Sequence, residues 1–131
     1  MSISSSAPWL KYYGDTPQHL KYPQKTIYEM VKAAADKYPK NYAYEFMGKK
    51  TTYAEFMQKI DAVAKAYLAL GIQKGDRVTI CMPNCPQAVD SFYALNRIGA
   101  VSNMIHPLSS EKEIEFYLKE SGSLFAITLD Q

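Results

Sequence analysis

The sequence has little cysteine: only Cys81 and Cys85 occur among its 131 residues. A structural zinc site needs about four ligands, and the two histidines, His19 and His106, stand far from this pair and from each other. These spacings do not form a zinc pattern. We therefore expect two free thiols, with Cys81 buried.

The sequence also lacks an excess of charge of one sign, a long apolar run and a secretory leader. The formal net charge is +2, and Lys49-Lys50 is the longest basic run, which argues against a nucleic-acid-binding surface. No apolar stretch approaches the roughly 18 residues of a membrane span, and residues 1–6 do not resemble a signal peptide. The expected location is the cytosol.

What remains is the composition of a folded domain, with 47% hydrophobic and 21% charged residues. Residues 1–25 differ from the rest because proline and aromatic residues interrupt regular structure there while offering large groups for packing. We predict an aromatic arm that covers its own domain, residues 26–131. A homodimer contact and a contact with a membrane surface are the alternatives for this arm.

Three helix starts are marked by a hydroxyl residue followed three positions later by glutamate, which is the pattern of a capping box. The pairs are Thr26 with Glu29, Thr52 with Glu55, and Ser110 with Glu113. They predict helices over 26–38, 52–70 and 110–121. In the first helix the apolar side consists of Ile27, Met30, Val31 and Ala34, and in the second it consists of Phe56, Ile60, Val63, Tyr67 and Leu70.

Between these helices the pattern predicts a β-hairpin over 42–52 that turns at Met47-Gly48, and a helix over 86–98. Apolar and β-branched residues predict strands over 77–81, 101–105 and 124–129. Strands separated by helices pair in parallel through right-handed crossovers. The predicted fold class is therefore α/β, a three-layer parallel sheet with flanking helices plus a small hairpin.

Ligands of such sheets bind beyond the carboxyl ends of the strands, which directs attention to the loops at 82–85 and 106–109. Neither loop contains glycine, which a phosphate-binding turn requires. Gly71 and Gly75 precede a strand, which is the reverse of the order in a phosphate loop. The sequence thus predicts no self-sufficient nucleotide site.

Candidate catalytic residues are few. Ser91 and Ser102 lack the flanking glycines of a nucleophile elbow. Three aspartates, at positions 61, 76 and 90, fall on helices or a turn, where solvated charge is the usual explanation. His106 is a candidate ligand contact because it follows a predicted parallel strand, although it can also hydrogen-bond its own loop while Pro107 rigidifies the turn.

Four segments in order resemble motifs of the AMP-forming adenylating enzymes. Residues 51–56, TTYAEF, are similar to T-Y-x-E-L, and residues 71–78, GIQKGDRV, to G-x-x-x-G-D-x-V. Residues 82–84, MPN, resemble x-P-N, and residues 94–101, ALNRIGAV, resemble A-x-x-x-x-G-A-V. The opening of the arm, residues 7–13, is similar to the start of bacterial long-chain fatty-acid CoA ligases.

The resemblance implies the amino-terminal part of the large domain of an acyl-CoA synthetase, inactive by itself. The full enzyme would use ATP, Mg²⁺ and CoA to convert a fatty or other apolar acid into its CoA thioester. The family's Ser/Thr/Gly-rich phosphate loop ending in lysine, and its later motifs, are not found in these 131 residues. No catalytic, cofactor or metal ligand is therefore assigned to this chain.

Two departures from the family pattern define the candidate substrate- or CoA-proximal residues. His106-Pro107 stands where many relatives have Asn-Pro, and Leu108 stands where some carry a basic residue near the CoA entrance. Lys112 is the candidate substitute for that basic residue. A stand-alone binding or dimerisation module, and an adenylating enzyme with another acceptor such as a carrier protein, remain alternatives.

Overall fold

The computed structural model describes residues 7–129, so the first six residues of the predicted arm and residues 130–131 lie outside it. Within these residues, all four α-helices begin and end at the predicted bounds or within one residue of them, and the strands follow the prediction as closely. The elements are a 3-10 turn at Leu10–Tyr12, α1 (Ile27–Lys37), β1 (Tyr42–Phe46), β2 (Lys49–Thr52), α2 (Tyr53–Ala69), β3 (Arg77–Cys81), α3 (Pro86–Ile98), β4 (Val101–Ile105), α4 (Glu111–Ser121) and β5 (Phe125–Thr128).

All three predicted capping boxes are present. The hydroxyl oxygens of Thr26, Thr52 and Ser110 accept the backbone N–H of the glutamate three residues on, and each glutamate accepts the backbone N–H of its cap residue. Because these hydrogen bonds favour the carboxylate form, the pKa of each glutamate is lowered, first by the backbone N–H and then by the hydroxyl. The starts of α1, α2 and α4 are thus fixed by local sequence.

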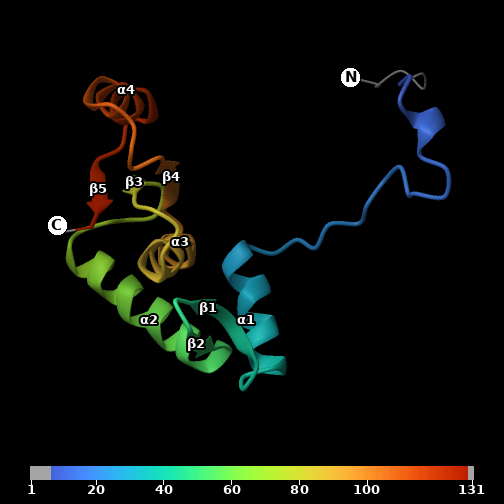
Figure 1. The fold of residues 1–131 in the computed structure, drawn as a ribbon, viewed down its shortest axis with the longest axis horizontal. Coiled ribbons are helices and arrows are strands. Elements are labelled where there is room, and N and C mark those ends of the chain that lie inside the picture. The colour runs from blue at the N-terminus through green and yellow to red at the C-terminus, as the bar shows by residue number, and fades with distance from the viewer. Residues whose placement is uncertain (1–6, 130–131) are drawn as a thin grey trace.

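The three later strands form a parallel sheet in the order β4-β3-β5, which confirms the predicted α/β class. The chain leaves β3 to one side for β4 and returns across it to β5, so right-handed crossovers place α3 and α4 on opposite faces. Figure 1 shows the sheet between α4 on one face and α3, backed by α2, on the other. These are the three predicted layers.

The core lies on the α3 face of the sheet. Val78 and Ile80 of β3 point into it and are fully buried, together with Ile60 of α2 and Leu95 of α3. On the opposite face, the hydroxyl of Thr79 donates to Ser123 Oγ at 2.8 Å and accepts the Asn103 amide at 3.0 Å. The apolar face is therefore the one that binds α2 and α3 to the sheet.

The predicted hairpin joins β1 and β2 as an antiparallel pair. Its turn residues Met47 and Gly48 have φ values of 50° and 79°, both in the left-handed region, as in a type I′ turn. Glycine adopts this conformation readily, whereas methionine does so at a cost. The turn therefore lies at Met47-Gly48, where the sequence predicted it.

The described part of the arm, residues 7–25, does not cover its own domain, contrary to the prediction. It projects away from the body in Figure 1, and Trp9, Tyr12 and Tyr22 are exposed. Its few backbone hydrogen bonds join neighbours within residues 7–25. The prolines and aromatic residues of this segment therefore contribute no packing to the core.

Several side chains also differ from the helical patterns. Ile27 and Met30 of α1 and Leu70 after α2 are exposed, whereas Tyr28, Val31 and Ala35 form the packed side of α1. On this packed side, the Tyr28 backbone N–H donates to Asn96 Oδ1 of α3 at 2.8 Å. This partner is distant in sequence, so periodicity within α1 could not reveal it.

Both cysteines are free, but Cys85, the residue before α3, is the buried one and Cys81 is only half-buried. Cys81 ends β3 on the side of the sheet that Thr79 occupies, where α4 covers the strands less closely. Cys85 packs with Met82 and Ala88 in the core cluster. The predicted burial of Cys81 was therefore wrong.

Candidate functional site

A pocket lies at the carboxyl ends of all three parallel strands. Its volume is about 580 Å³, and it is lined by residues 81–84 from the end of β3 and the loop after it, residues 104–108 from β4 and the loop after it, and residues 128–129 at the end of β5. Parallel strands end at the same edge of a sheet, so loops distant in sequence meet there. The structure therefore brings together the two loops that the sequence singled out, and adds the end of β5.

The loop after β3 is held by two buried side chains, those of Met82 and Cys85. Met82 is buried in the core cluster, while Pro83 and Asn84 are exposed at the rim. Pro86 then occupies the first position of α3, where the absence of a backbone N–H costs no hydrogen bond. The loop thus turns sharply from strand to helix without glycine.

His106 hydrogen-bonds its own loop, as the simpler of the two sequence interpretations predicted. Its Nδ1 accepts the backbone N–H of Leu108 at 3.1 Å, and its carbonyl oxygen accepts the N–H of Ser109 at 3.1 Å. In the neutral ring the proton therefore resides on Nε2, since Nδ1 is the acceptor. His106 lines the pocket while its loop contact fixes the orientation of the ring.

The other two candidates are separated by the structure. Pro107 lines the pocket beside His106, whereas Lys112 lies exposed in the first turn of α4 and is not among the lining residues. Leu108 also lines the pocket, yet its side chain is 86% exposed, so it forms part of the mouth. The geometry thus unites His106, Pro107 and Leu108 but not Lys112.

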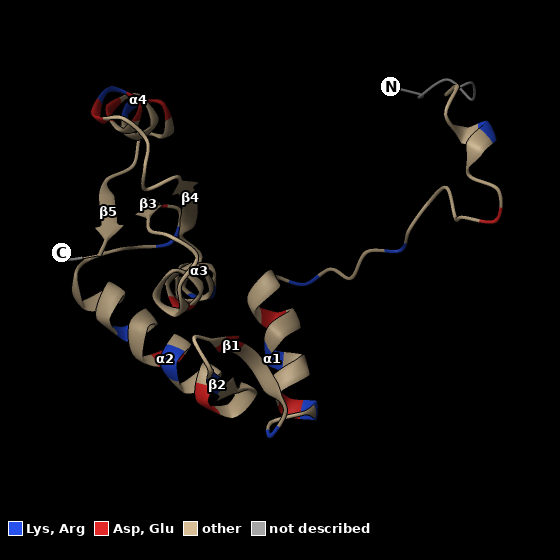
Figure 2. Ribbon diagram, viewed as in Figure 1, with Lys and Arg blue, Asp and Glu red and all other residues tan. Residues whose placement is uncertain are grey.

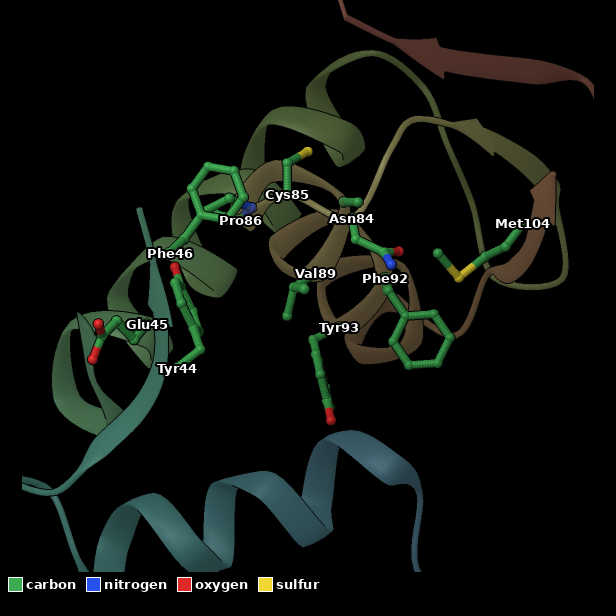
Figure 3. A pocket seen from close by; sticks show the side chains of 11 residues that line it. Tyr44, Glu45, Phe46, Asn84, Cys85, Pro86, Val89, Phe92, Tyr93 and Met104 are labelled. Carbon is green, nitrogen blue, oxygen red and sulfur yellow. The ribbon is translucent and has the colours of Figure 1, made fainter. Parts of the chain in front are cut away.

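A second, more apolar pocket of about 620 Å³ lies between β1 and α3 and was not predicted. Figure 3 shows Phe46 at its Cys85–Pro86 end and Phe92 beside Met104 at the other. Asn84 and Met104 line both pockets, so the two are adjacent. The alternation of Tyr44 and Phe46, together with Val89, Phe92 and Tyr93 at helical spacing, is the signal that could have revealed it.

Edge-to-face aromatic contacts build the floor of this second pocket. Phe56 of α2 meets Tyr44 at 5.4 Å and Tyr93 at 5.4 Å between ring centroids, and Phe92 meets Tyr93 at 5.3 Å. Such pairs stabilise packing beyond their buried area. The hairpin, α2 and α3 are therefore held together as one unit.

Asp90 of α3 was expected to be solvated, and this was wrong: it is only 8% exposed. Burial raises the pKa of its carboxyl group, while the Lys59 charge and the Tyr44 hydroxyl oppose the rise. Tyr44 Oη donates to Asp90 Oδ1 at 3.5 Å, and Lys59 Nζ donates to Tyr44 Oη at 3.0 Å. Asp90 thus ends a polar chain that crosses from α2 through the hairpin to α3.

The other two aspartates have structural roles. Asp61 pairs with Arg97 at 3.0 Å, and Asp76 accepts the Gln73 backbone N–H at 2.8 Å. In residues 7–129 no three histidine, cysteine or acidic side chains lie close enough to hold a metal ion. Figure 2 shows positive and negative residues interspersed over the helices, in line with the low net charge.

The sequence profile of AMP-binding enzymes matches residues 31–131. The long-chain-fatty-acid–CoA ligase of Bacillus subtilis is 36% identical over 98% of this chain, and that of Yersinia pestis is 34% identical over 94%. The chain spans about a quarter of the length of these relatives, 23% and 24% respectively. Each similarity thus concerns one part of a longer protein.

Solved structures that match this chain are likewise parts of longer proteins. The amino-terminal domain of FACL13 from Mycobacterium tuberculosis, in an inhibitor-bound form, matches with a TM-score of 0.76 and 34% identity over 80% of this chain and 27% of that chain. The NpsA amino-terminal subdomain from Klebsiella oxytoca, in complex with 3-hydroxyanthranilyl-AMSN, matches with a TM-score of 0.79 and 27% identity over 81% and 27%. Since the profile covers α2, the whole parallel sheet and both pocket-forming loops, this chain belongs to the AMP-binding enzyme family.

Proposed function

We propose that this chain is the amino-terminal part of the large domain of a fatty-acid CoA ligase. The observation that supports the proposal is the pocket at the carboxyl edge of the sheet, which is lined by one family motif, residues 82–84, and by the His106-Pro107 loop. The bacterial relatives named long-chain-fatty-acid–CoA ligase support the choice of a fatty acid as substrate. The proposed location is the cytosol.

In the proposed reaction, a fatty carboxylate and ATP give an acyl-adenylate and pyrophosphate, and the CoA thiol then displaces AMP. Residues 7–129 do not fit the ATP phosphates or Mg²⁺, because both strand-to-helix loops at the carboxyl edge lack glycine and no acidic cluster accompanies them. We assign no step of either reaction to these residues. They act as the scaffold that other residues of the enzyme complete.

The carboxyl-edge pocket is the part of this scaffold proposed to contact substrate or CoA. Its lining is largely apolar, with the His106 ring as a polar group that can hydrogen-bond and Pro107 fixing the loop. Lys112 remains a proposed contact for an anionic group of CoA, made from outside the pocket. These assignments rest on position in the fold.

Acid-dependent exchange of pyrophosphate into ATP tests the proposal. We expect exchange with long-chain fatty acids from the complete product of the gene that encodes this chain, and none from the 131-residue chain. If the complete product gave no exchange with any fatty acid, the ligase assignment would be wrong. Exchange catalysed by the 131-residue chain alone would refute the scaffold role.

A carrier protein as the acyl acceptor is the second candidate, because the structural neighbours include an artificially fused adenylation–PCP di-domain that contains NpsA, with a TM-score of 0.80 and 28% identity. Incubating the complete gene product with ATP and a fatty acid, and then with either CoA or a phosphopantetheinyl carrier protein, separates the two. Acyl-CoA formation supports the ligase. Acyl transfer to the carrier alone supports this alternative.

A further inference from the structure

The apolar pocket between β1 and α3 exposes side chains that are ordinarily buried. Met104 of β4 is 54% exposed, Phe46 of β1 is 39% exposed and Val89 of α3 is 37% exposed, and all three line this pocket. No helix within residues 7–129 combines the length and the hydropathy of a membrane span, so this surface is not that of a membrane-spanning helix. Apolar side chains gathered in a concave site are typical of a binding site for an apolar group.

The polar groups that β1 brings to this pocket are already paired. The Tyr44 hydroxyl donates to Asp90 and accepts a hydrogen bond from Lys59. The Glu45 carboxylate lies 3.9 Å from the Lys50 ammonium group, and Figure 3 shows it directed away from the centre of the pocket. An ionised group would therefore find no free partner along this wall, whereas a hydrocarbon chain needs none.

The apolar pocket continues into the pocket at the carboxyl edge of the sheet. Asn84 and Met104 line both, and His106 lies beyond them in the carboxyl-edge pocket. The loop contact of His106 uses Nδ1, which leaves Nε2 to donate a hydrogen bond. The two pockets together thus run from an apolar end at Phe46 to an end with hydrogen-bonding groups, which suits a molecule with an apolar tail and a polar head.

We propose that the apolar pocket holds the hydrocarbon tail of the acid while its carboxyl end lies in the carboxyl-edge pocket. This inference rests on the proposed function, because it takes a fatty acid as the substrate. The volume of about 620 Å³ lies within the range of roughly 300–1,000 Å³ that is usual for small-molecule sites. Met104, at the junction of the two pockets, has a flexible, unbranched side chain that can move aside for the tail.

Val89 is the residue proposed to limit the length of the tail. Figure 3 shows its side chain between Phe46 at one end of the pocket and Phe92 at the other. A larger side chain at this position would occupy the space where the far end of a long tail would lie. The identity of residue 89 should accordingly affect long acids more than short ones.

A photoreactive fatty acid tests the site in the unaltered enzyme. Hexadecanoic acid with a diazirine near its last carbon is irradiated with the complete product of the gene that encodes this chain, and the labelled peptides are identified by mass spectrometry. We expect label on the pocket residues of β1 and α3, and its loss when excess hexadecanoate competes. Label confined to residues outside this chain would overturn the proposal and would assign the tail site to another part of the enzyme. Absence of label that hexadecanoate displaces would overturn it as well.

Acid-dependent pyrophosphate exchange by the complete gene product tests the role of Val89. Val89→Trp should lower the ratio of kcat/KM for hexadecanoate to that for octanoate by about tenfold or more, because each methylene kept out of the pocket loses roughly fourfold in binding. Leu68→Trp is the matched control, since Leu68 is an exposed apolar residue of α2 that lines neither pocket, and it should leave the ratio unchanged.

The outcomes separate this inference from the ligase assignment. If the wild-type enzyme exchanges pyrophosphate with both acids and Val89→Trp keeps the wild-type ratio, the tail site is wrong while the ligase assignment stands. If the wild-type enzyme gives no exchange with any fatty acid, the ligase assignment fails and this inference fails with it. Should Val89→Trp not fold, the photolabelling of the unaltered enzyme decides.

Discussion

Asp90 shows how a single buried charge is tolerated between three elements. The carboxyl group accepts a hydrogen bond from the Tyr44 hydroxyl, and the Lys59 ammonium group lies beyond that hydroxyl. Burial of the carboxyl group is nevertheless the largest influence on its pKa and raises it. Because the folded-state pKa is raised above the ordinary value of 3.8, the folded protein binds the proton more tightly than the unfolded chain. Ionisation of Asp90 therefore costs stability as the pH rises.

Asp90→Asn should stabilise the protein at neutral pH, since the amide stays uncharged and its oxygen can still accept the Tyr44 hydroxyl. Urea denaturation from pH 3 to pH 7 measures the effect. The difference between variant and wild type should vanish below about pH 3.8, where Asp90 is protonated in both states, and grow as the pH rises through the raised pKa. A variant less stable than wild type at pH 7 would mean that attraction to Lys59 outweighs the burial cost.

The burial of Asp90 is in line with its helical spacing from a core residue. Asp90 precedes Ala94 by four residues, and Ala94 is fully buried, so both lie on the core side of α3. The exposed Met47 had no such signal, because its conformation follows from the hairpin turn and not from its residue type. Single side chains were thus harder to predict than the elements that carry them.

At the scale of elements, the helix starts were predictable because a capping box is encoded within four residues. The start of α2 offers the best test of a capping box, because β2 of the hairpin leads into it without a loop. There the Thr52 hydroxyl accepts the Glu55 N–H at 3.3 Å. Thr52→Ala should lower the free energy of unfolding by about 1 kcal/mol. Chemical denaturation measures this, with Thr16→Ala in the exposed arm as the control.

The effect of Thr52→Ala should also depend on pH. The pKa of Glu55 is lowered by the Thr52 backbone N–H and hydroxyl, so the stabilisation is present above the ordinary value of 4.5 and is lost as the pH falls through the lowered pKa. The difference between wild type and Thr52→Ala should therefore shrink below about pH 4.5. A difference that stays constant into acid would show that the carboxylate takes no part in the cap.

Strand identity and parallel pairing followed from the alternation of strands with helices, but strand order did not. A crossover of this length can place the next strand on either side of β3, and the choice depends on contacts far apart in sequence. Two walls of the carboxyl-edge pocket, the loops after β3 and β4, were predictable because each follows a predicted parallel strand. Its third wall, residues 128–129, required the position of β5.

For the molecule as a whole, the arm and the remaining domain contribute differently to stability. Deleting residues 1–25 should leave the melting temperature of the body unchanged, because the described residues of the arm add no side chain to the core cluster. Differential scanning calorimetry checks this. A marked loss of stability would show that the arm packs on the body after all.

The same deletion bears on the alternative in which the arm joins two copies. Sedimentation velocity of the intact chain and the deleted chain should then show a dimer that dissociates when the aromatic residues are removed. A monomer in both preparations would eliminate the homodimer. The exposed Trp9, Tyr12 and Tyr22 are the side chains available for such a contact.

The central position of β3 links the assembly of the sheet to that of the pocket. β3 is synthesised first of the three strands yet remains unpaired on one side until β5, the last, reaches it. Closing these distant contacts costs chain entropy, so β5 should join late in folding. The wall that β5 supplies to the carboxyl-edge pocket then forms last, and completion of the sheet and readiness to hold a ligand become a single event.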